Sequence, residues 1–369
     1  MNLKVISLMR HALSLAYTVF KLLPQNGHKV VFLSRQSDTV PPDFAMLASR
    51  LTAQDPQTRI VFRCRRFGST PRWQAAYILQ ILGDAWHLAT ARVAVLDSYS
   101  IAVSVLKHRP SLYVIQLWHA MGKIKRSGYA NLGMPYGRSA ALAQALSMHA
   151  NNDLVVAGGE AWNRFYRESF GPGHYQLLNV GLPRLDRLLT DGGIRQRLLD
   201  AYPVLTQKTV ILYAPTWRPS GQSGADELLR QVDSDTYALI VREHWKTGHD
   251  ARETVISPDV PTVDLLTVCD YLVTDYSAIA VEAAALRVKT LYYVFDYDDY
   301  ANNNGLNIDL FAEMPGCVFK DAAELMAALK SGRYDDATLE RYRAKYLPSQ
   351  PGHATEAICT VILDHLRDG

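Results

Sequence analysis

The fold class follows from one stretch of sequence, Tyr271-Leu272-Val273-Thr274-Asp275-Tyr276-Ser277-Ala278-Ile279-Ala280-Val281-Glu282. Its first four residues form a short apolar run, which predicts a buried strand ending at Thr274. Apolar residues resume at Ile279 and predict a helix directly after the strand. A strand that leads straight into a helix is typical of a parallel sheet with crossover connections.

The same alternation recurs along most of the chain. Further strands are predicted at residues 29–34, 59–64, 92–97, 112–118, 153–157, 175–180, 209–214, 237–242 and 290–295. A polar helical stretch near residues 184–202 divides them into two sets, and 369 residues exceed what one hydrophobic core normally holds. We therefore predict an α/β protein with two Rossmann-like domains, at 26–190 and 191–352, whose parallel sheets face a central cleft. A C-terminal helix is predicted at 353–369.

The composition excludes several classes of protein. Hydrophobic residues make up 48% of the chain and charged residues 20%, which is typical of a globular protein. The net charge of +3 is too small to indicate nucleic acid as a partner. The four cysteines lie far apart, without the spacing of zinc or redox motifs, so we expect reduced thiols of a cytosolic protein. No residue pattern requires a cofactor or a metal ion, and the acidic residues after Tyr293 favour a solvated loop.

The first 25 residues have the pattern of an amphipathic helix. Polar side chains recur at steps of three and four, and apolar residues fill the rest of the circumference; the polar positions are Lys4, Ser7, His11, Ser14, Thr18 and Lys21. Lysines and Arg10 interrupt any run long enough to span a membrane. Two interpretations of residues 3–23 stay open: a helix packed on the protein's own core, or a helix that lies in the membrane interface.

The first candidate site follows the strand predicted at 112–118. The sequence there is Trp118-His119-Ala120-Met121-Gly122-Lys123-Ile124-Lys125-Arg126. His119 could take a proton from a hydroxyl while Lys123 and Lys125 balance phosphate charge. A single histidine is more often structural, so both interpretations stay open.

Other candidate residues also follow predicted strands. Arg184 begins a helix after Gly181-Leu182-Pro183, where a local ion pair with Asp186 is the simpler alternative. Thr216 and Arg218 follow the strand at 209–214, and an arginine suits phosphate through its bidentate fork. An aromatic anchor with a surface arginine is the alternative there.

Two strand ends complete the predicted second side of the cleft. Arg242 and His244 lie two positions apart, so both are expected to point into the cleft. Asp275 or Ser277 can cap the following helix, whose first amides offer a site for an anion. Glu282 is the only charge in an apolar helical run and could accept hydrogen bonds from ribose hydroxyls.

Together these motifs resemble the CDP-glycerol:glycerophosphotransferase family of teichoic acid primases and polymerases, whose fold is similar to that of the two-domain GT-B glycosyltransferases. The resemblance extends from about Lys29 to the final helix. It is carried, in the family's order, by Trp118-His119-Ala120-x-Gly122 with its trailing lysines, Gly181-x-Pro183-Arg184-x-Asp186, Tyr213-Ala214-Pro215-Thr216-Trp217-Arg218, Thr274-Asp275-Tyr276-Ser277 and Tyr293–Tyr300.

The resemblance implies a transferase that moves a polyol phosphate, with glycerol phosphate as the first expectation, from a CDP-activated donor to a hydroxyl of a lipid-linked saccharide. CMP is released. It implies catalytic roles for His119, as general base, and His244. The donor's phosphates are assigned to Arg242, Thr216, Arg218, Asp275, Ser277 and Glu282. Phosphate neutralisation on the acceptor side is assigned to Lys123, Lys125 and Arg184.

The resemblance also implies the partners: CDP-glycerol or CDP-ribitol, a polyprenyl-diphosphate-linked acceptor, and the cytoplasmic face of the cell membrane, contacted through residues 3–23. The length fits a primase-like enzyme. Ala278, Glu282 and Asn304 depart from the family's usual residues and leave the polyol open. The alternatives are a nucleotide-sugar glycosyltransferase or epimerase of the same architecture, and a non-catalytic membrane-bound scaffold.

Overall fold

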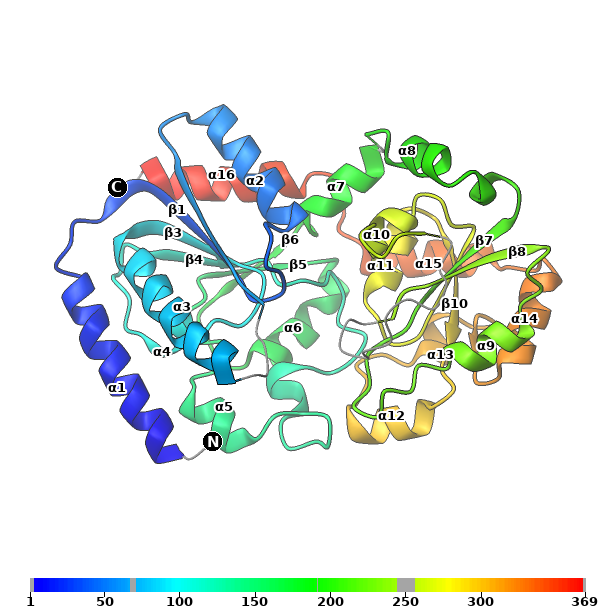
Figure 1. Cartoon of the computed structure of the whole chain (residues 1–369), viewed down its shortest axis with the longest axis horizontal. Helices are drawn as coiled ribbons and strands as arrows, with labels where there is room; N and C mark the ends of the chain where they lie inside the picture. Colours follow the sequence, from blue (N-terminus) through cyan, green and yellow to red (C-terminus); the bar gives the residue numbers. More distant parts are fainter. Residues whose placement is uncertain (1–2, 67–70, 191, 244–255, 368–369) are drawn as a thin grey trace.

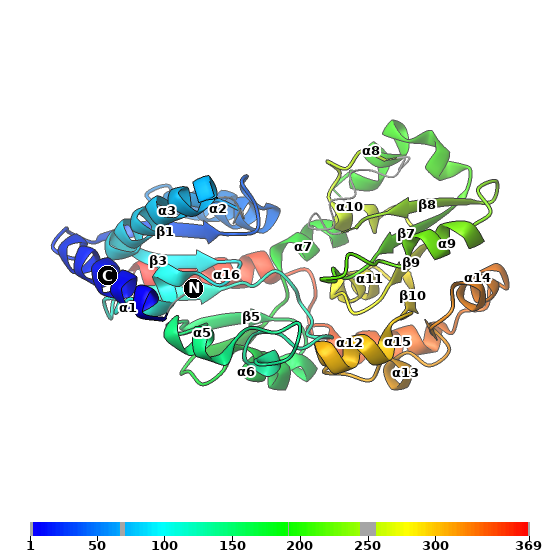
Figure 2. The same cartoon turned by 60° about the horizontal axis from the view of Figure 1, so that its bottom comes forward.

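The chain folds into two lobes, each built on a parallel sheet, in a computed structural model that describes residues 3–66, 71–190, 192–243 and 256–367. Figures 1 and 2 show the lobes side by side, with helices on both faces of each sheet. The strand order is β2-β1-β3-β4-β5-β6 in the first sheet and β11-β10-β9-β7-β8 in the second. The predicted α/β class with two parallel sheets is confirmed.

The first lobe contains the longer sheet. Its strands are β1 (Asn26–Ser34), β2 (Arg59–Cys64), β3 (Ala91–Leu96), β4 (Tyr113–Gln116), β5 (Leu154–Ala157) and β6 (Gln176–Asn179). Its helices are α1 (Leu3–Phe20), α2 (Pro42–Gln54), α3 (Pro71–Thr90), α4 (Ile101–Val105), α5 (Ala140–Ala145) and α6 (Asn163–Phe170), with 3-10 turns η1 (Gly128–Asn131) and η2 (Glu160–Trp162).

The second lobe repeats the plan on a shorter sheet. Its strands are β7 (Thr209–Ala214), β8 (Tyr237–Val241), β9 (Tyr271–Thr274), β10 (Lys289–Tyr293) and β11 (Val318–Phe319). Its helices are α8 (Ile194–Ala201), α9 (Ala225–Gln231), α10 (Thr262–Leu265), α11 (Ile279–Ala285), α12 (Tyr297–Asn303), α13 (Leu310–Glu313), α14 (Ala322–Lys330) and α15 (Asp336–Tyr346), with the turn η3 (Pro203–Thr206). Helix α7 (Pro183–Thr190) leads from the first lobe towards the second.

The last helix, α16 (Ala354–Arg367), crosses back to the first lobe. It packs against α2, β1 and β3 (Figure 1). Its first amides, those of Ala354 and Thr355, donate to the carboxylate of Asp186 at 3.1 and 2.7 Å. Asp186 is thus an N-terminal cap for a helix far along the chain. The alternative in which it pairs with Arg184 is wrong.

The two lobes share one hydrophobic core. Trp162 is fully buried between them, stacks on Tyr346 at 4.3 Å and donates its indole N–H to the Tyr346 carbonyl at 3.1 Å. Gly122 permits close packing, because a Cβ there would lie 2.6 Å from Cγ2 of Val281 in α11. Side-chain atoms cannot approach so closely, so Gly122, three residues after His119, allows the lobes their close spacing.

A pair of loops ties the lobes together on the other side of this contact. The Arg126 amide donates to the Gly305 carbonyl at 3.0 Å, and the Asn307 amide donates to the Ile124 carbonyl at 2.9 Å. The side-chain amide of the buried residue Asn304 donates from Nδ2 to the Arg126 carbonyl at 3.1 Å. The loop after β4 is therefore held in place by the second lobe.

Helix α1 is present as predicted and packs along α3. Ile6 and Tyr17 are buried, whereas Leu8 and Leu15 are 72% and 70% exposed. In the part of the chain that is described, no helix is long and apolar enough to cross a membrane. The helix thus uses a narrow edge for packing and leaves a broad apolar face uncovered.

Candidate functional site

A pocket of about 270 Å³ opens between the lobes beside the end of β4. Most of its lining residues belong to the first lobe, among them Trp118 and Lys125. The second lobe contributes Trp217, Pro219, Tyr300 and Asn304. The basic residues that line the pocket are Lys125, Arg126, Arg138 and His149, and no carboxylate is among the described residues that line it. The pocket is suited to an anion, and its aromatic walls are suited to a ring or a carbon chain.

The end of β4 is shaped to present Trp118 and His119. Trp118 has a φ of +60°, a left-handed conformation that costs energy in a non-glycine residue. Its amide donates to Oε1 of Gln116 at 3.0 Å, which helps hold that conformation. The two successive side chains consequently turn out of the strand, with ring centroids 4.2 Å apart.

His119 is held in the tautomer that a general base needs. Its Nδ1 lies 3.1 Å from the Asp97 carbonyl, which can only accept, so Nδ1 carries the proton and Nε2 keeps a lone pair. His119 is exposed to solvent, although protein atoms surround its ring closely enough to desolvate it in part. Desolvation and the nearby charge of Lys123 and Arg184 lower its pKa, so the ring is neutral at neutral pH.

Lys123 lies beneath this motif rather than in the pocket. It is buried, with Nζ 4.5 Å from the ring centre of Trp118, 4.9 Å from that of Tyr166 and 5.1 Å from that of Phe170. Burial lowers its pKa to about 7. Lys123 therefore packs under the Trp118 ring, and its contacts with the three rings are cation–π contacts in its protonated form.

Lys125 reaches the pocket itself. It is half-buried and lines the wall near the second lobe. Burial lowers its pKa to about 8, and the charge of Asp275 partly opposes that shift. Of the three cations assigned to phosphate neutralisation, Lys125 is the one that lines this pocket.

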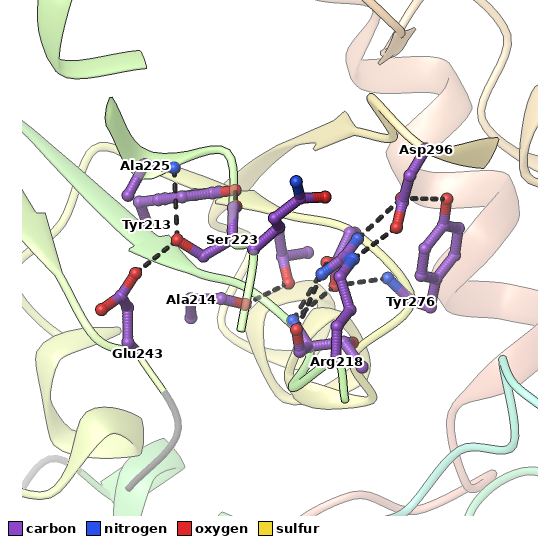
Figure 3. A network of polar contacts seen from close by, with 12 residues as sticks. Tyr213, Ala214, Arg218, Ser223, Ala225, Glu243, Tyr276 and Asp296 are labelled. Carbon is purple, nitrogen blue, oxygen red and sulfur yellow. Dashed lines mark hydrogen bonds and ion pairs between the residues drawn. The ribbon is translucent and has the colours of Figure 1, made fainter. Parts of the chain in front are cut away.

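Arg218 is the centre of a buried ion-pair network (Figure 3). It is 2% exposed, and its Nη2 donates to Oδ1 of Asp296 at 2.8 Å while Nε donates to the other oxygen of that carboxylate. Its Nη1 donates to Asp275 Oδ2 at 2.8 Å and to the Thr216 carbonyl at 2.7 Å. The Tyr276 hydroxyl also donates to Asp296, at 3.1 Å. These pairs fix the loop after β7 against the end of β9.

Asp275 takes part in this network and does not cap α11. Its carboxylate accepts from the amides of Thr216, at 2.8 Å, and Tyr276, at 2.6 Å. Helix α11 begins without a side-chain cap, and the Ser277 hydroxyl lies 3.5 Å from the Ile279 amide. Ser277 is half-buried, and Oγ1 of Thr216 is buried without a partner among the described residues.

Arg184 and Glu282 bind each other across the lobes. Arg184 Nη2 donates to Glu282 Oε1 at 2.8 Å, and Nη1 donates to Asp43 Oδ2 at 2.7 Å. It also donates to the His119 carbonyl at 2.9 Å. Desolvation opposes the charge on Arg184, but Asp43 and Glu282 more than offset it and raise the pKa. This arrangement connects α2, α7 and α11 behind His119, and a role for either residue in binding substrate stays a prediction.

Arg242 lies at the end of β8, as predicted, and donates from Nη2 to the Ser257 carbonyl at 2.7 Å. Its Nε is buried without a partner in the described part of the chain. His244 lies outside the described residues. Neighbouring Glu243 accepts a hydrogen bond from the Ser223 hydroxyl (Figure 3).

His149 and Arg138 line the pocket but were not singled out from the sequence. Neither belongs to a strand–helix junction, the pattern that identified the other candidates. The one local signal was the polar run around Asn151 and Asn152, which predicts a turn but no chemistry.

Comparison with known proteins places this geometry in a family. The sequence matches CDP-glycerol:poly(glycerophosphate) glycerophosphotransferases over residues 15–364. The chain belongs to this family. It is 30% identical to the teichoic acid ribitol-phosphate primase of Bacillus spizizenii, with 94% of each chain covered. It is 27% identical to the teichoic acid poly(ribitol-phosphate) polymerase of that organism, covering 94% of this chain but 58% of the polymerase.

The fold agrees with a solved member of the same group. The wall teichoic acid polymerase TagF superposes with a TM-score of 0.73 at 18% identity, covering 100% of this chain and 98% of TagF. Family membership makes the chain a transferase of CDP-activated polyol phosphates in wall teichoic acid synthesis. The predicted family and GT-B-like fold are confirmed.

Proposed function

We propose that this chain adds a polyol phosphate unit from a CDP-polyol to a hydroxyl of a lipid-linked saccharide, in a primase-like reaction at the cytoplasmic face of the membrane. The observation that carries this proposal is His119, a neutral imidazole with Nδ1 fixed on the Asp97 carbonyl beside a cationic pocket. Nε2 accepts the acceptor's hydroxyl proton as that oxygen attacks the donor's β-phosphorus. The bond between β-phosphorus and the bridging oxygen breaks, and CMP leaves.

Positioning and charge carry most of this chemistry, because the leaving group is a phosphate monoester. We assign Lys125 to the transferring phosphoryl group, since it lines the pocket. Thr216, Ser277, Arg242 and His244 are assigned to the donor's phosphates, on the second-lobe side. Arg218 and Asp275 act indirectly, by holding the Thr216 loop in place.

Two donors are candidates. The family's description names glycerol phosphate, whereas similarity over 94% of both chains to a ribitol-phosphate primase favours ribitol phosphate. The same relative is a primase, which favours addition of a single unit. We place ribitol phosphate first and glycerol phosphate second.

The membrane surface is assigned to α1 and the adjoining edge of α3. Met9 of α1 and Ile78 of α3 are both exposed and line the same groove between the helices, so their apolar faces are continuous. Leu79 extends that surface. Lys4 on α1 and Lys21, directly after its end, suit anionic headgroups.

A donor screen tests the proposal. Purified enzyme is incubated with a synthetic lipid-linked disaccharide and CDP-ribitol, CDP-glycerol or UDP-sugars, and release of CMP or UDP is followed. We expect CMP from a CDP-polyol, and a fall of about 10²- to 10⁴-fold in His119→Ala. His174→Ala, at an exposed loop position, is the matched control and should not change the rate.

The other outcomes separate the alternatives. UDP release without CMP release would indicate a nucleotide-sugar enzyme. Equal rates for wild type and His119→Ala, or no turnover with any donor, would favour a scaffold that retains the fold.

A further inference from the structure

His149 lies on the wall of the same pocket, in the turn that follows α5. Its side chain is 7% exposed and is held among three aromatic rings. The ring centroids lie 4.5 Å from Phe170, 5.6 Å from Trp118 and 5.6 Å from Tyr99. The imidazole consequently has one position, beside the motif that presents His119.

The backbone around His149 is strained and firmly anchored. Ser147, His149 and Asn151 have φ values of +46°, +61° and +65°. Each left-handed non-glycine residue costs on the order of 1 kcal/mol or more, so the surrounding structure has to enforce the turn. Asn151 Nδ2 donates to the carbonyls of Val103 and Leu106, each at 2.8 Å, and Asn152 Nδ2 donates to the His149 carbonyl at 2.9 Å. Strain that is enforced in this way, at the wall of a pocket, points to a function for the side chain.

The two ring nitrogens of His149 differ in environment. Nδ1 is buried and has no partner among the described residues, whereas Nε2 is not enclosed in this way. Nε2 lies above Gly128, 3.3 Å from where a Cβ would stand. A buried N–H without an acceptor is costly, so the proton belongs on Nε2 and the lone pair on Nδ1. Desolvation and nearby Lys123 and Arg138 lower the pKa, which keeps the ring neutral.

His119 and His149 therefore have opposite tautomers. The Asp97 carbonyl fixes the proton of His119 on Nδ1 and leaves Nε2 as an acceptor. His149 carries its proton on Nε2 and is a donor. Lys125, Arg126 and Arg138 give the pocket positive charge, and no described carboxylate lines it, so the acceptor that best suits this donor is an anionic oxygen.

We propose that His149 contacts substrate, donating from Nε2 to a phosphate oxygen while His119 accepts the hydroxyl proton. This inference rests on the proposed function, because that reaction brings phosphate into the pocket. The phosphate belongs either to the donor's diphosphate or to the acceptor's diphosphate, and the two sources are distinguished below.

Two variants of His149 test the role of Nε2. In His149→Gln the amide nitrogen can occupy the place of Nε2, whereas in His149→Asn the shorter side chain cannot reach it. Asn is also the better residue for a left-handed backbone, so a merely structural role predicts that His149→Asn is the milder change. We expect the opposite order for activity: kcat/KM for CMP release falls about 10- to 100-fold in His149→Asn and much less in His149→Gln. Thermal unfolding of both variants checks the fold.

Binding measurements identify the phosphate and separate this inference from the proposed function. If His149 holds the donor, calorimetry shows weaker binding of CDP by His149→Asn with cytidine binding unchanged. If it holds the acceptor, CDP binding is unchanged and the KM for the lipid-diphosphate acceptor rises. Wild-type protein that binds CDP but releases no CMP would overturn the proposed function, while loss of CDP affinity in His149→Asn would still support the contact. Two outcomes would overturn the proposed contact between His149 and phosphate. One is a His149→Asn variant with unchanged CDP affinity and unchanged kinetics, and the other is activity in both variants that simply follows their melting temperatures.

Discussion

At the scale of the residue, the charged groups behind the pocket satisfy one another. Arg218 shares its donors between Asp275 and Asp296, and Arg184 shares its donors between Asp43 and Glu282. A buried charge without a partner is far more costly than the pair is stabilising. Each of these charged groups therefore depends on its partners, because removing one leaves the others as buried charges without a counter-charge.

Replacing Arg218 by Ala leaves two carboxylates unpaired, and the one on Asp275 is fully buried. We expect the free energy of unfolding to fall by about 3–5 kcal/mol. Urea denaturation measures this change. Arg341→Ala is the matched control, because its pair with Asp335 is exposed and worth little. If Arg218 instead serves mainly to bind phosphate, the variant keeps its stability and loses affinity for CDP.

Lys123 gives the protein a dependence of stability on pH. Burial lowers its pKa from 10.5 to about 7, so between these values the unfolded chain holds a proton that the folded chain does not. The contribution of Lys123 to the free energy of unfolding is therefore fully present above about pH 10.5. It falls as the pH falls from about 10.5 to about 7, by up to about 1.4 kcal/mol per pH unit, and is lost below about 7. In Lys123→Met the apolar volume remains and the proton is absent. We expect the free energy of unfolding to rise less between pH 7 and pH 9.5 in this variant than in the wild type; equal slopes would contradict the assignment.

The position of the site was predictable from sequence, but the pairing of its charges was not. Arg218, Asp275 and Glu282 were found because each follows a strand end or interrupts an apolar run. Their charged partners lie 57 to 98 residues away, and nothing local distinguishes an arginine that binds phosphate from one that binds a distant carboxylate. His149 was missed for a related reason, since its position depends on a strained turn and on rings from other elements.

At the scale of the element, α1 is unusual because most of its apolar surface is uncovered. A helix packed on a core buries its apolar side and exposes its polar one. Here Ile6 and Tyr17 provide the packing, and exposed leucines face outward. This distribution favours the interfacial interpretation of residues 3–23 over the one in which the helix is simply part of the core.

Changing both Leu8 and Leu15 to Asp should release the protein from liposomes that contain anionic lipid. Burying a leucine contributes about 1.5–3 kcal/mol, so the partition coefficient is expected to fall roughly 100-fold or more. Both side chains are largely exposed, so stability should change by less than about 0.5 kcal/mol. His11→Asp is the control: it lies on the polar stripe, so we expect this variant to keep most of its liposome binding and to lose only the part that its added negative charge removes. Cosedimentation measures the partition, and unchanged binding of the double variant would show that α1 does not contact the membrane.

The elements themselves were largely predictable. Each strand expected from an apolar run is present, and the largest shift moves the start of β1 from residue 29 to residue 26. Strand β11 was missed because its two residues are too short to produce a pattern. The return of α16 to the first lobe was also missed, since its docking depends on the cap from Asp186, a contact that no local signal reveals.

At the scale of the whole molecule, the site exists only because the lobes are held at a fixed spacing. The pocket takes its walls from both lobes, and the loop that carries Lys125 is hydrogen-bonded to the second lobe through Gly305 and Asn307. Gly122 and Val281 meet where the two lobes pack closely against each other. The geometry of His119 relative to the donor side consequently depends on a contact that includes neither a charge nor a catalytic group.

Adding one methyl group at Gly122 tests this dependence. In Gly122→Ala the new Cβ would lie 2.6 Å from Val281 Cγ2, so the lobes have to separate or α11 has to shift. We expect a loss of about 1–3 kcal/mol of stability and a fall in CMP release. Val281→Ala removes the opposing methyl, so the double variant should be more active and more stable than the sum of the single changes predicts, although nearby Trp162 limits the recovery. Gly27→Ala is the control, because no atom lies within 4 Å of its added Cβ. Strictly additive effects in the double variant would mean that this contact does not set the spacing between the lobes.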